Sequence, residues 1–319
     1  MQRALRLDVE PPAQVDLQQV ESLAASRRGL LWLDLLDPTE GELTWLQGAF
    51  GFHPLAVEDC RHFNQRVKLE EYDDHLFLAM HFPRREDKRT ELTSDELHVF
   101  LGPSFLVTVH QAAMATLEEV WRRLEHEPRR FETGPDFLFY LLIDRLVDSF
   151  FPVLDAMDDW IDTLEQRVIR RTRATAMHEI FVLQRNLLFL RRASGPLREV
   201  LHTLAFRDHD LVDRKSAFYY RDAYDHLIRI HDTTEIQRDL LANVLDVYLS
   251  ITSNRLNESI KRLTVVATVF LPLSFIVGFG GMNFKHIPFD NPLAFVLTLL
   301  LIAATPGAMY VLFRWRGWI

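Results

Sequence analysis

An acidic run in the middle of the sequence has the first residues whose type and spacing suggest chemistry. Carboxylates are the ligands that Mg²⁺ prefers, so an aspartate-rich run could chelate Mg²⁺ for a diphosphate-using enzyme. The run consists of Asp155, Asp158, Asp159, Asp162 and Glu165. No second such cluster occurs, and the spacing is that of an amphipathic surface helix. We interpret the run as a solvated acidic face, with a loose cation reservoir as the open alternative.

Other groups that could carry catalysis lack the partners that catalysis needs. Cys60 and His62 have no further ligands at metal-site spacing. His178-Glu179 is not followed by the second histidine that a zinc protease requires. Neither a glycine-rich phosphate loop nor a nucleophile elbow is present. We therefore predict that the protein is not an enzyme. Cys60 is the only cysteine, so no intrachain disulfide can form, which favours a reducing compartment.

Charged residues almost disappear after residue 262. The sequence has 36 Lys and Arg and 45 Asp and Glu, but beyond Arg262 only Lys285, Asp290, Arg314 and Arg316 remain. The part before this point is acidic, which argues against a nucleic acid partner, because nucleic acid selects basic surfaces. An uncharged tail of this length would leave apolar surface exposed in a soluble protein. We therefore expect the C-terminal part to lie in a lipid bilayer.

Two uncharged segments, Leu263–Phe279 and Leu293–Phe313, approach or reach the roughly 20 residues that span a bilayer. They predict spans at about 260–280 and 292–313. A buried helical hairpin is the alternative, but soluble core helices seldom lack charge over this length. Basic residues precede the first segment and follow the second: Arg255, Lys261, Arg262, Arg314 and Arg316. The positive-inside rule then places both termini in the cytoplasm and the connecting loop outside.

Short apolar runs and helix signals interleave in the first 130 residues, which predicts an α/β cytoplasmic domain. The expected strands are Leu30–Leu36, His75–Phe82, Leu92–Leu101 and Phe105–His110, and the expected helices are Ala13–Ala25, Glu40–Phe50 and Ala112–His126. Long helices follow: Pro135 to about Arg171, Ala174–Phe206, and a stalk helix that starts near Asp213 and runs into the first span. We predict three domains, 1–130, 131–256 and 257–319.

The first span ends in Gly278-Phe279-Gly280-Gly281-Met282-Asn283. This Gly-Met-Asn, at the outer end of the first of two C-terminal spans, strongly resembles the signature of the CorA family of divalent cation transporters. Further stretches resemble the same family: Leu263–Ile276, Arg221–His226, Leu245–Leu249, and in the N-terminal part His53-Pro54-Leu55, Glu58-Asp59 and Gln65-Arg66-Val67-Lys68. The likeness covers essentially the whole chain.

The resemblance implies a homopentameric funnel in a prokaryotic inner membrane, with five first spans lining a pore. Gly281, Met282 and Asn283 would form the selectivity motif, where amide and carbonyl oxygens suit a hydrated Mg²⁺. We expect Gly280 and Gly281 to let the backbone turn sharply there. Residues three or four apart share a helix face. The predicted pore-lining series is Asn257, Ile260, Leu263 (or Thr264), Ala267, Leu271, Ser274 and Gly278.

The resemblance also implies gating by cytoplasmic Mg²⁺. Asp222 matches the position where the family places an ion between adjacent subunits, and the acid nearest to the expected place for its partner is Asp87. Asp246, in a stretch that resembles the family, is a further metal candidate. Two carboxylates across an interface repel, and a divalent cation between them reverses the sign of that interaction.

Two positions differ from the family's usual pattern. Gly280 stands where a tyrosine is common, and Lys285 lies in a loop that is commonly acidic. Our hypothesis is therefore a Mg²⁺ channel, with a Co²⁺, Ni²⁺ or Zn²⁺ transporter on the same fold as the nearest rival. A non-conducting membrane-anchored scaffold and a tethered aspartate-rich enzyme are rivals from other classes.

Overall fold

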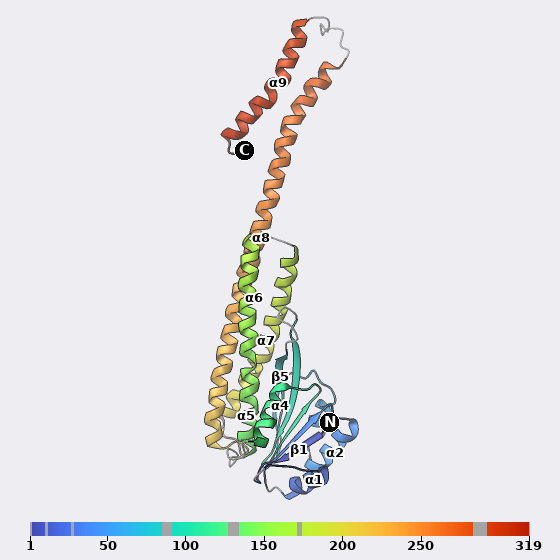
Figure 1. Cartoon of the computed structure of the whole chain (residues 1–319), viewed down its shortest axis with the longest axis vertical. Coiled ribbons are helices and arrows are strands. Elements are labelled where there is room, and N and C mark those ends of the chain that lie inside the picture. The colour runs from blue at the N-terminus through green and yellow to red at the C-terminus, as the bar shows by residue number, and fades with distance from the viewer. Residues whose placement is uncertain are drawn as a thin grey trace. The chain divides into compact units, whose positions relative to one another are not determined.

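The computed structural model describes residues 2–9, 12–26, 29–84, 91–126, 134–170, 174–282 and 292–318 (Figure 1). The chain divides into two compact units, Met1–Leu245 and Asp246–Ile319. The first unit contains the sheet and most of the helices, and the second contains the two apolar segments. Each unit is described by itself below.

The first unit is built on a seven-stranded mixed sheet with the order β2-β1-β3-β7-β6-β5-β4. Its strands are β1 (Gln2–Arg6), β2 (Ala13–Gln14), β3 (Leu31–Leu36), β4 (Lys68–Glu71), β5 (Leu76–Arg84), β6 (Thr93–Leu101) and β7 (Phe105–His110). β3 and β7 pair in parallel, and the other neighbours are antiparallel. The four strands that we predicted are confirmed as β3, β5, β6 and β7. β1, β2 and β4 are short or polar, and periodicity did not reveal them.

Helices cover both faces of the sheet. Successive side chains of the central strands point to opposite faces, and both faces are apolar. One face packs on α1 (Leu17–Ser26), α2 (Glu40–Phe50) and α3 (Pro54–Asp59). Phe52 is central to this core and stacks on Phe100 with ring centroids 4.0 Å apart. The opposite face packs against α4 (Ala115–His126) and the long helices that follow. The result is a three-layer α/β unit, as the sequence indicated.

Two predicted helices have different limits in the structure. The prediction of a helix from Ala13 was wrong at its start, because Ala13 and Gln14 pair with β1 as an edge strand. The predicted helix from Pro135 is two helices, α5 (Pro135–Asp148) and α6 (Phe150–Arg170), with a turn at Ser149. Pro152 explains the break, because it has no N–H to donate to the carbonyl of Asp148.

α6, α7 (Ala174–Phe206) and α8 (Arg214–Gly280) are the longest helices of the chain apart from α9, and the first two contact each other. α8 begins beside α5, where the Asp136 carboxylate accepts a hydrogen bond from the Asp213 N–H at 2.9 Å. The Gln237 amide of α8 donates to the Leu154 carbonyl of α6 at 2.9 Å. The acidic run on α6 is exposed at all five positions, which confirms a solvated face. α8 is 67 residues long in all and contains Pro272.

The second unit contains the rest of α8 and α9 (Pro292–Trp315). Both helices are long and apolar enough to cross a membrane, and neither apolar window is buried inside the protein. The Lys261 ammonium on α8 donates to the Gly317 carbonyl just after α9, at 3.1 Å. This bond ties the two helices together at the end where the basic residues gather.

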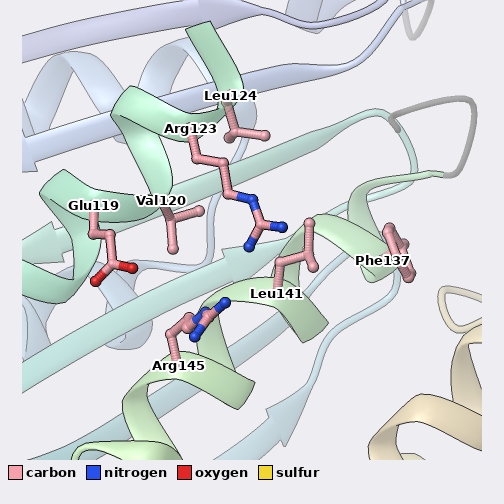
Figure 2. A pocket seen from close by; sticks show the side chains of 7 residues that line it. All are labelled: Glu119, Val120, Arg123, Leu124, Phe137, Leu141 and Arg145. Atoms are coloured by element: carbon pink, nitrogen blue, oxygen red, sulfur yellow. The ribbon is translucent and has the colours of Figure 1, made fainter. Parts of the chain in front are cut away.

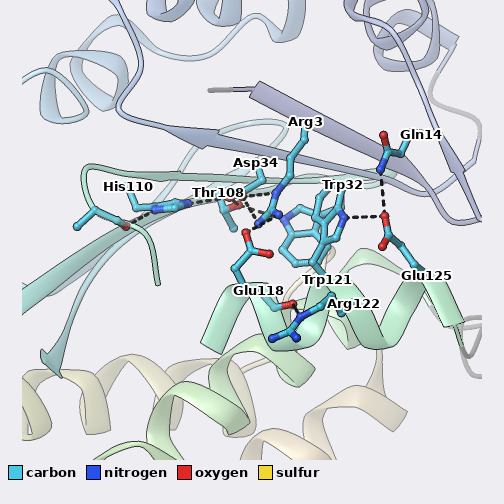
Figure 3. Close-up of polar contacts among 11 residues, drawn as sticks. Arg3, Gln14, Trp32, Asp34, Thr108, His110, Glu118, Trp121, Arg122 and Glu125 are labelled. Atoms are coloured by element: carbon cyan, nitrogen blue, oxygen red, sulfur yellow. Dashed lines mark hydrogen bonds and ion pairs between the residues drawn. The ribbon is translucent and has the colours of Figure 1, made fainter. Parts of the chain in front are cut away.

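A buried ionic network fastens the sheet to α4 (Figure 3). Asp34 on β3 is 2% exposed and accepts hydrogen bonds from the Arg3 guanidinium at 2.9 Å and from Thr108. His110 Nε2 lies 3.0 Å from the same carboxylate. Arg3 also reaches Glu118 on α4 at 2.6 Å. The network therefore joins β1, β3, β7 and α4.

Burial disfavours the charged forms of both Asp34 and His110. In each residue, the interaction with the other residue outweighs this effect of burial. The hydrogen bond and charge of Asp34 raise the pKa of His110 above its ordinary value. The hydrogen bond from His110 lowers the pKa of Asp34, in spite of its burial. A raised histidine pKa stabilises the fold below the unfolded-state value, about 6.5. That contribution is lost as the pH rises through the higher folded-state pKa.

We expect His110→Gln to lower the thermal midpoint of the full-length protein most at pH 6 and least above the folded-state pKa of His110. Removing one partner of a buried pair typically costs about 3 kcal/mol. Thermal unfolding from pH 5 to 9 measures the difference, with His62→Gln as the control, because His62 is exposed. A destabilisation by His110→Gln that does not change with pH would contradict the charged pair.

Candidate cation sites

Two carboxylates and an imidazole converge where α5 and α8 face each other. Asp144 comes from α5, and Asp222 and His226 come from one face of α8, four residues apart. One ligand atom from each of the three residues lies within 4.8 Å of the other two. We call these three residues the cation group. Asp222 is exposed, and Asp144 and His226 are half-buried, so the group opens to solvent on one side.

A fourth acid stands beside the cation group. Asp148 lies one turn after Asp144 on α5, and its Oδ1 is 3.3 Å from Nδ1 of His226. The phenyl ring of Phe151 meets the His226 imidazole edge-on at 5.7 Å. These contacts hold the ring between α5 and α8.

Negative charge in the cation group exceeds positive charge. Burial and the charge of Asp148 raise the pKa of Asp144, and Asp222 adds to this effect. Burial and the charges of Asp144 and Asp222 raise the pKa of the neighbouring Tyr140 phenol to about 12. Both shifts mean that the folded protein resists further negative charge here. A divalent cation would remove that penalty, and two carboxylates with one imidazole are a usual ligand set for such an ion.

The structure describes two of the three predicted metal residues, Asp222 and Asp246. Asp222 lies with Asp144 and His226 of its own chain, which our sequence analysis did not identify as ligands. Asp87 lies outside the described residues. Asp246 is exposed further along α8 and is not in the group. The missed signal was a pair of four-residue spacings, Asp144 with Asp148 and Asp222 with His226, on helices far apart in sequence.

The predicted pore-lining series forms one exposed face of α8 in the second unit. All its members are exposed in the single chain: Asn257, Ile260, Leu263, Thr264, Ala267, Leu271, Ser274 and Gly278. Leu263 and Leu271 are 70% and 71% exposed. A separate stripe of α8 is partly covered, at Lys261, Val265, Thr268, Pro272 and Ile276. At 100° per residue, the centres of the two sets lie roughly 120° apart around the helix, so they occupy neighbouring faces.

The selectivity motif is described only in part. Gly281 and Met282 follow the last turn of α8, where the Gly281 N–H donates to the Val277 carbonyl at 3.0 Å. Asn283 lies outside the described residues. Neither Gly280 nor Gly281 has a positive φ, and the expectation that these glycines permit a sharp turn stays a prediction, because the residues that follow Met282 lie outside the described ones. Both continue the right-handed path of the helix end.

A cavity of about 90 Å³ between α4 and α5 carries no comparable chemistry (Figure 2). It is lined by Glu119, Val120, Arg123, Leu124, Phe137, Leu141 and Arg145. Small-molecule sites usually have about 300 Å³ or more. This cavity is therefore too small to be a substrate site.

An α/β unit whose longest helix continues into the first of two apolar segments of membrane-spanning length points to a membrane protein. The sequence matches the family of CorA-like Mg²⁺ transporter proteins over residues 27–315. The chain therefore belongs to the CorA family of divalent cation transporters, which are not enzymes.

Relatives and a solved structure agree with this assignment. The chain is 36% identical over 273 residues to the cobalt/magnesium transport protein CorA of Thermotoga maritima, covering 85% of this chain and 78% of that protein. It is 24% identical to the CorA of Methanocaldococcus jannaschii, covering 91% and 92% of the two chains. The fold matches the complete structure of the M. jannaschii CorA magnesium transporter with a TM-score of 0.86, over 100% and 99% of the chains at 22% identity.

We expect Asp144→Asn to raise the stability of the ion-free protein and to weaken its stabilisation by Mg²⁺. The substitution removes one of the repelling carboxylates and, at the same time, a ligand. At about ten times its Kd, Mg²⁺ should add about 1.4 kcal/mol to the wild type. Thermal unfolding in EDTA and in millimolar Mg²⁺ measures both effects. Asp158→Asn, an exposed acid of the α6 run, is the matched control. An equal Mg²⁺ response in Asp144→Asn and wild type would rule out Asp144 as a ligand.

Proposed function

We propose that the protein is a homopentameric channel for Mg²⁺ uptake that closes when cytoplasmic Mg²⁺ binds to the cation group. The observation that carries the proposal is the exposed face of α8, which bears the predicted pore series and leads to the Gly-Met-Asn motif. The T. maritima relative bears the name of a cobalt/magnesium transport protein. That name supports Mg²⁺ and Co²⁺ as the ions to test first.

The composition of this exposed face favours a pore over a simple anchor. Lipid can cover Ile260, Leu263 and Leu271, but Asn257 and Ser274 on the same face need polar surroundings. A water-filled pore between several copies of α8 would supply them. Five copies follow from the family resemblance, with α9 of each subunit outside the ring. The partly covered stripe of α8 supports this arrangement, because it leaves the pore series free.

Ion selection would take place at the Asn283 end of this face. Mg²⁺ is reluctant to lose its waters and is bound through oxygen. A ring of Asn283 amides with Gly281 carbonyls would contact those waters without the deep trap that five full charges would create. Deeper in the pore, apolar rings such as that of Leu271 could close the path by dewetting.

The basic residues support an orientation with both termini in the cytoplasm of a prokaryotic cell. Lys261, which bonds to the end of α9, and Arg314 and Arg316 beyond the second span belong to the cytoplasmic side by the positive-inside rule. The cation group would then sample cytoplasmic Mg²⁺. Asp87 of a neighbouring subunit and Asp246 remain candidates for additional ligands. Transport of Co²⁺, Ni²⁺ or Zn²⁺ on the same fold is the second candidate function.

Flux into proteoliposomes that contain the full-length protein tests the pore. We expect Asn283→Ala to abolish Mg²⁺ flux and to leave the oligomer intact, because the ring loses its side-chain oxygens. Asn254→Ala makes the same change at an exposed position of α8 outside the predicted pore series and should retain flux. Size-exclusion chromatography checks assembly. Wild-type flux in an assembled Asn283→Ala protein would show that the motif does not form the pore mouth.

Leu271 provides a separate test of the closing constriction. A polar ring holds water, so we expect Leu271→Asn to raise the basal leak of Mg²⁺ at high internal Mg²⁺. Phe270→Asn is the control, since Phe270 is also exposed but lies outside the pore series. Leak measured by a Mg²⁺-sensitive dye reports the effect. If leak is the same in Leu271→Asn and in wild type, Leu271 packs against other helices instead.

A further inference from the structure

Basic side chains gather at one end of the second unit, where its two apolar segments meet the charged parts of the chain. On α8, Lys261 and Arg262 come directly before the uncharged segment. On α9, Arg314 and Arg316 come directly after it. The bond from Lys261 to the Gly317 carbonyl, at 3.1 Å, holds the two helix ends together. These basic residues therefore lie next to the edge of the hydrocarbon, which is the depth of lipid headgroups.

The end of α9 is a closed turn of defined geometry. Gly317 is left-handed, with a φ of 68°, and its N–H donates to the Arg314 carbonyl at 3.2 Å. The Trp318 N–H donates to the Phe313 carbonyl at 2.8 Å, and the two rings stack with centroids 5.7 Å apart. These two bonds are those of a Schellman helix ending. The turn presents the Gly317 carbonyl to Lys261 and fixes the last turn of α9, from which Arg314 projects.

Arg262 and Arg314 leave the helix pair on the same side. The partly covered stripe of α8 begins at Lys261 and that of α9 ends at Phe313, so these are the faces that meet. Each arginine follows its stripe residue by one position, a rotation of about 100°. Because α9 runs back toward Lys261, opposite in direction to α8, both rotations lead to the same side (Figure 1). Arg316 lies about 200° beyond Arg314 and leaves from the other side of α9.

Positive charge exceeds negative charge at this end. Among residues 250–282 and 292–318, Glu258 is the only acid, and it pairs with Arg262. A guanidinium has five N–H donors, so this pair leaves donors for a second anion. Arg314 is exposed and makes no ion pair with the part of the chain that the structure describes. The two arginines can therefore accept a negative group from outside the protein.

Trp315 indicates what kind of molecule carries that negative group. Its side chain is 82% exposed, although it stands two residues after the buried Phe313. That spacing directs the indole away from α8. Tryptophan suits the boundary between headgroups and hydrocarbon, because its ring is apolar and its N–H is polar. A free anion in water would leave this ring uncovered, whereas a lipid brings an acyl chain with its phosphate.

We propose that Arg262 and Arg314 bind the phosphate of an acidic phospholipid, with Trp315 against its acyl chains. Guanidinium groups match phosphate through paired N–H donors, and basic pockets between membrane helices suit such headgroups. The lipid bridges α8 and α9 on the side that the Lys261 bond leaves open. Lipid binding at this end goes beyond the proposed function and does not require that the protein conducts ions.

Quenching by brominated lipids tests the site in the full-length protein, reconstituted into vesicles. Trp315 and Trp318 are the tryptophans of the second unit, so bromine on the acyl chains of bound lipid quenches them. Titrating brominated phosphatidylglycerol against phosphatidylcholine gives the ratio of the two affinities. We expect wild type to favour phosphatidylglycerol by about tenfold or more, and Arg262→Gln and Arg314→Gln each to lower the ratio about fivefold. Arg314→Lys keeps the charge and should retain most of the preference.

Arg316→Gln is the matched control, because it removes the same charge at the same depth from the other side of α9. It should change the ratio much less than Arg314→Gln does. Equal losses in these two variants would show diffuse attraction to an anionic surface and overturn the site, as would a wild type without preference. If millimolar inorganic phosphate at constant ionic strength abolishes the preference, the arginines bind a free anion and the lipid assignment is wrong.

Flux of Mg²⁺ is measured separately on the same vesicles. A preference for phosphatidylglycerol without flux leaves the lipid site standing and contradicts the channel proposal. Flux without the preference does the reverse.

Discussion

The continuity of α8 is the constraint on which the rest of the structure depends. One uninterrupted helix contains Asp222 and His226 near its start and the exposed pore series near its end. Backbone hydrogen bonds run from each turn to the next along such an element, so both sets of residues belong to one unbroken helical segment of the chain. Its interior proline, Pro272, falls in the apolar segment, where neighbouring helices can satisfy the freed carbonyl.

Two groups of buried or half-buried acids show how charge balance separates a structural role from a binding role. Asp34 is surrounded by Arg3, Thr108 and His110, and its carboxylate has a partner for each oxygen. Its pKa falls although it is buried. Asp144 faces Asp148 and Asp222, and its pKa rises. In the first group every carboxylate oxygen of Asp34 has a partner, and the group fixes the sheet on α4. The second has unbalanced negative charge, which an ion from solution can neutralise.

The two proposed cation sites differ in the chemistry that they offer. The pore face presents amide, hydroxyl and apolar groups without full charges, which suits a hydrated ion that must leave as readily as it enters. The cation group presents two carboxylates and an imidazole, which suits an ion that stays bound. In the proposed channel, conduction would then rely on weak contacts and sensing on strong ones. The ion that the pore face prefers need not be the ion that the cation group prefers.

The sequence by itself determined the membrane segments, the long helices and the family. Loss of charge after Arg262 is a local property, and hydrocarbon tolerates few alternatives to an apolar helix, so α8 and α9 could be predicted from composition. The strands β3, β5, β6 and β7 were equally clear, because each contains an apolar run that is buried on both faces. The short edge strand β2 was misread as helix, because its pairing with β1 leaves little trace in two residues.

Only the tertiary structure decided which acids meet. Asp144 and Asp222 lie on helices that two other helices, α6 and α7, separate in the sequence, and neither spacing nor composition indicates that α5 will lie against the start of α8. That arrangement follows from the packing of apolar faces, which places polar residues on the remaining surface without marking them in advance. The helix break at Ser149 likewise depends on the position of Pro152, which has no backbone N–H, within the packed helices. Contacts between distant residues are set by the sum of many weak packing interactions, and a single sequence does not list them.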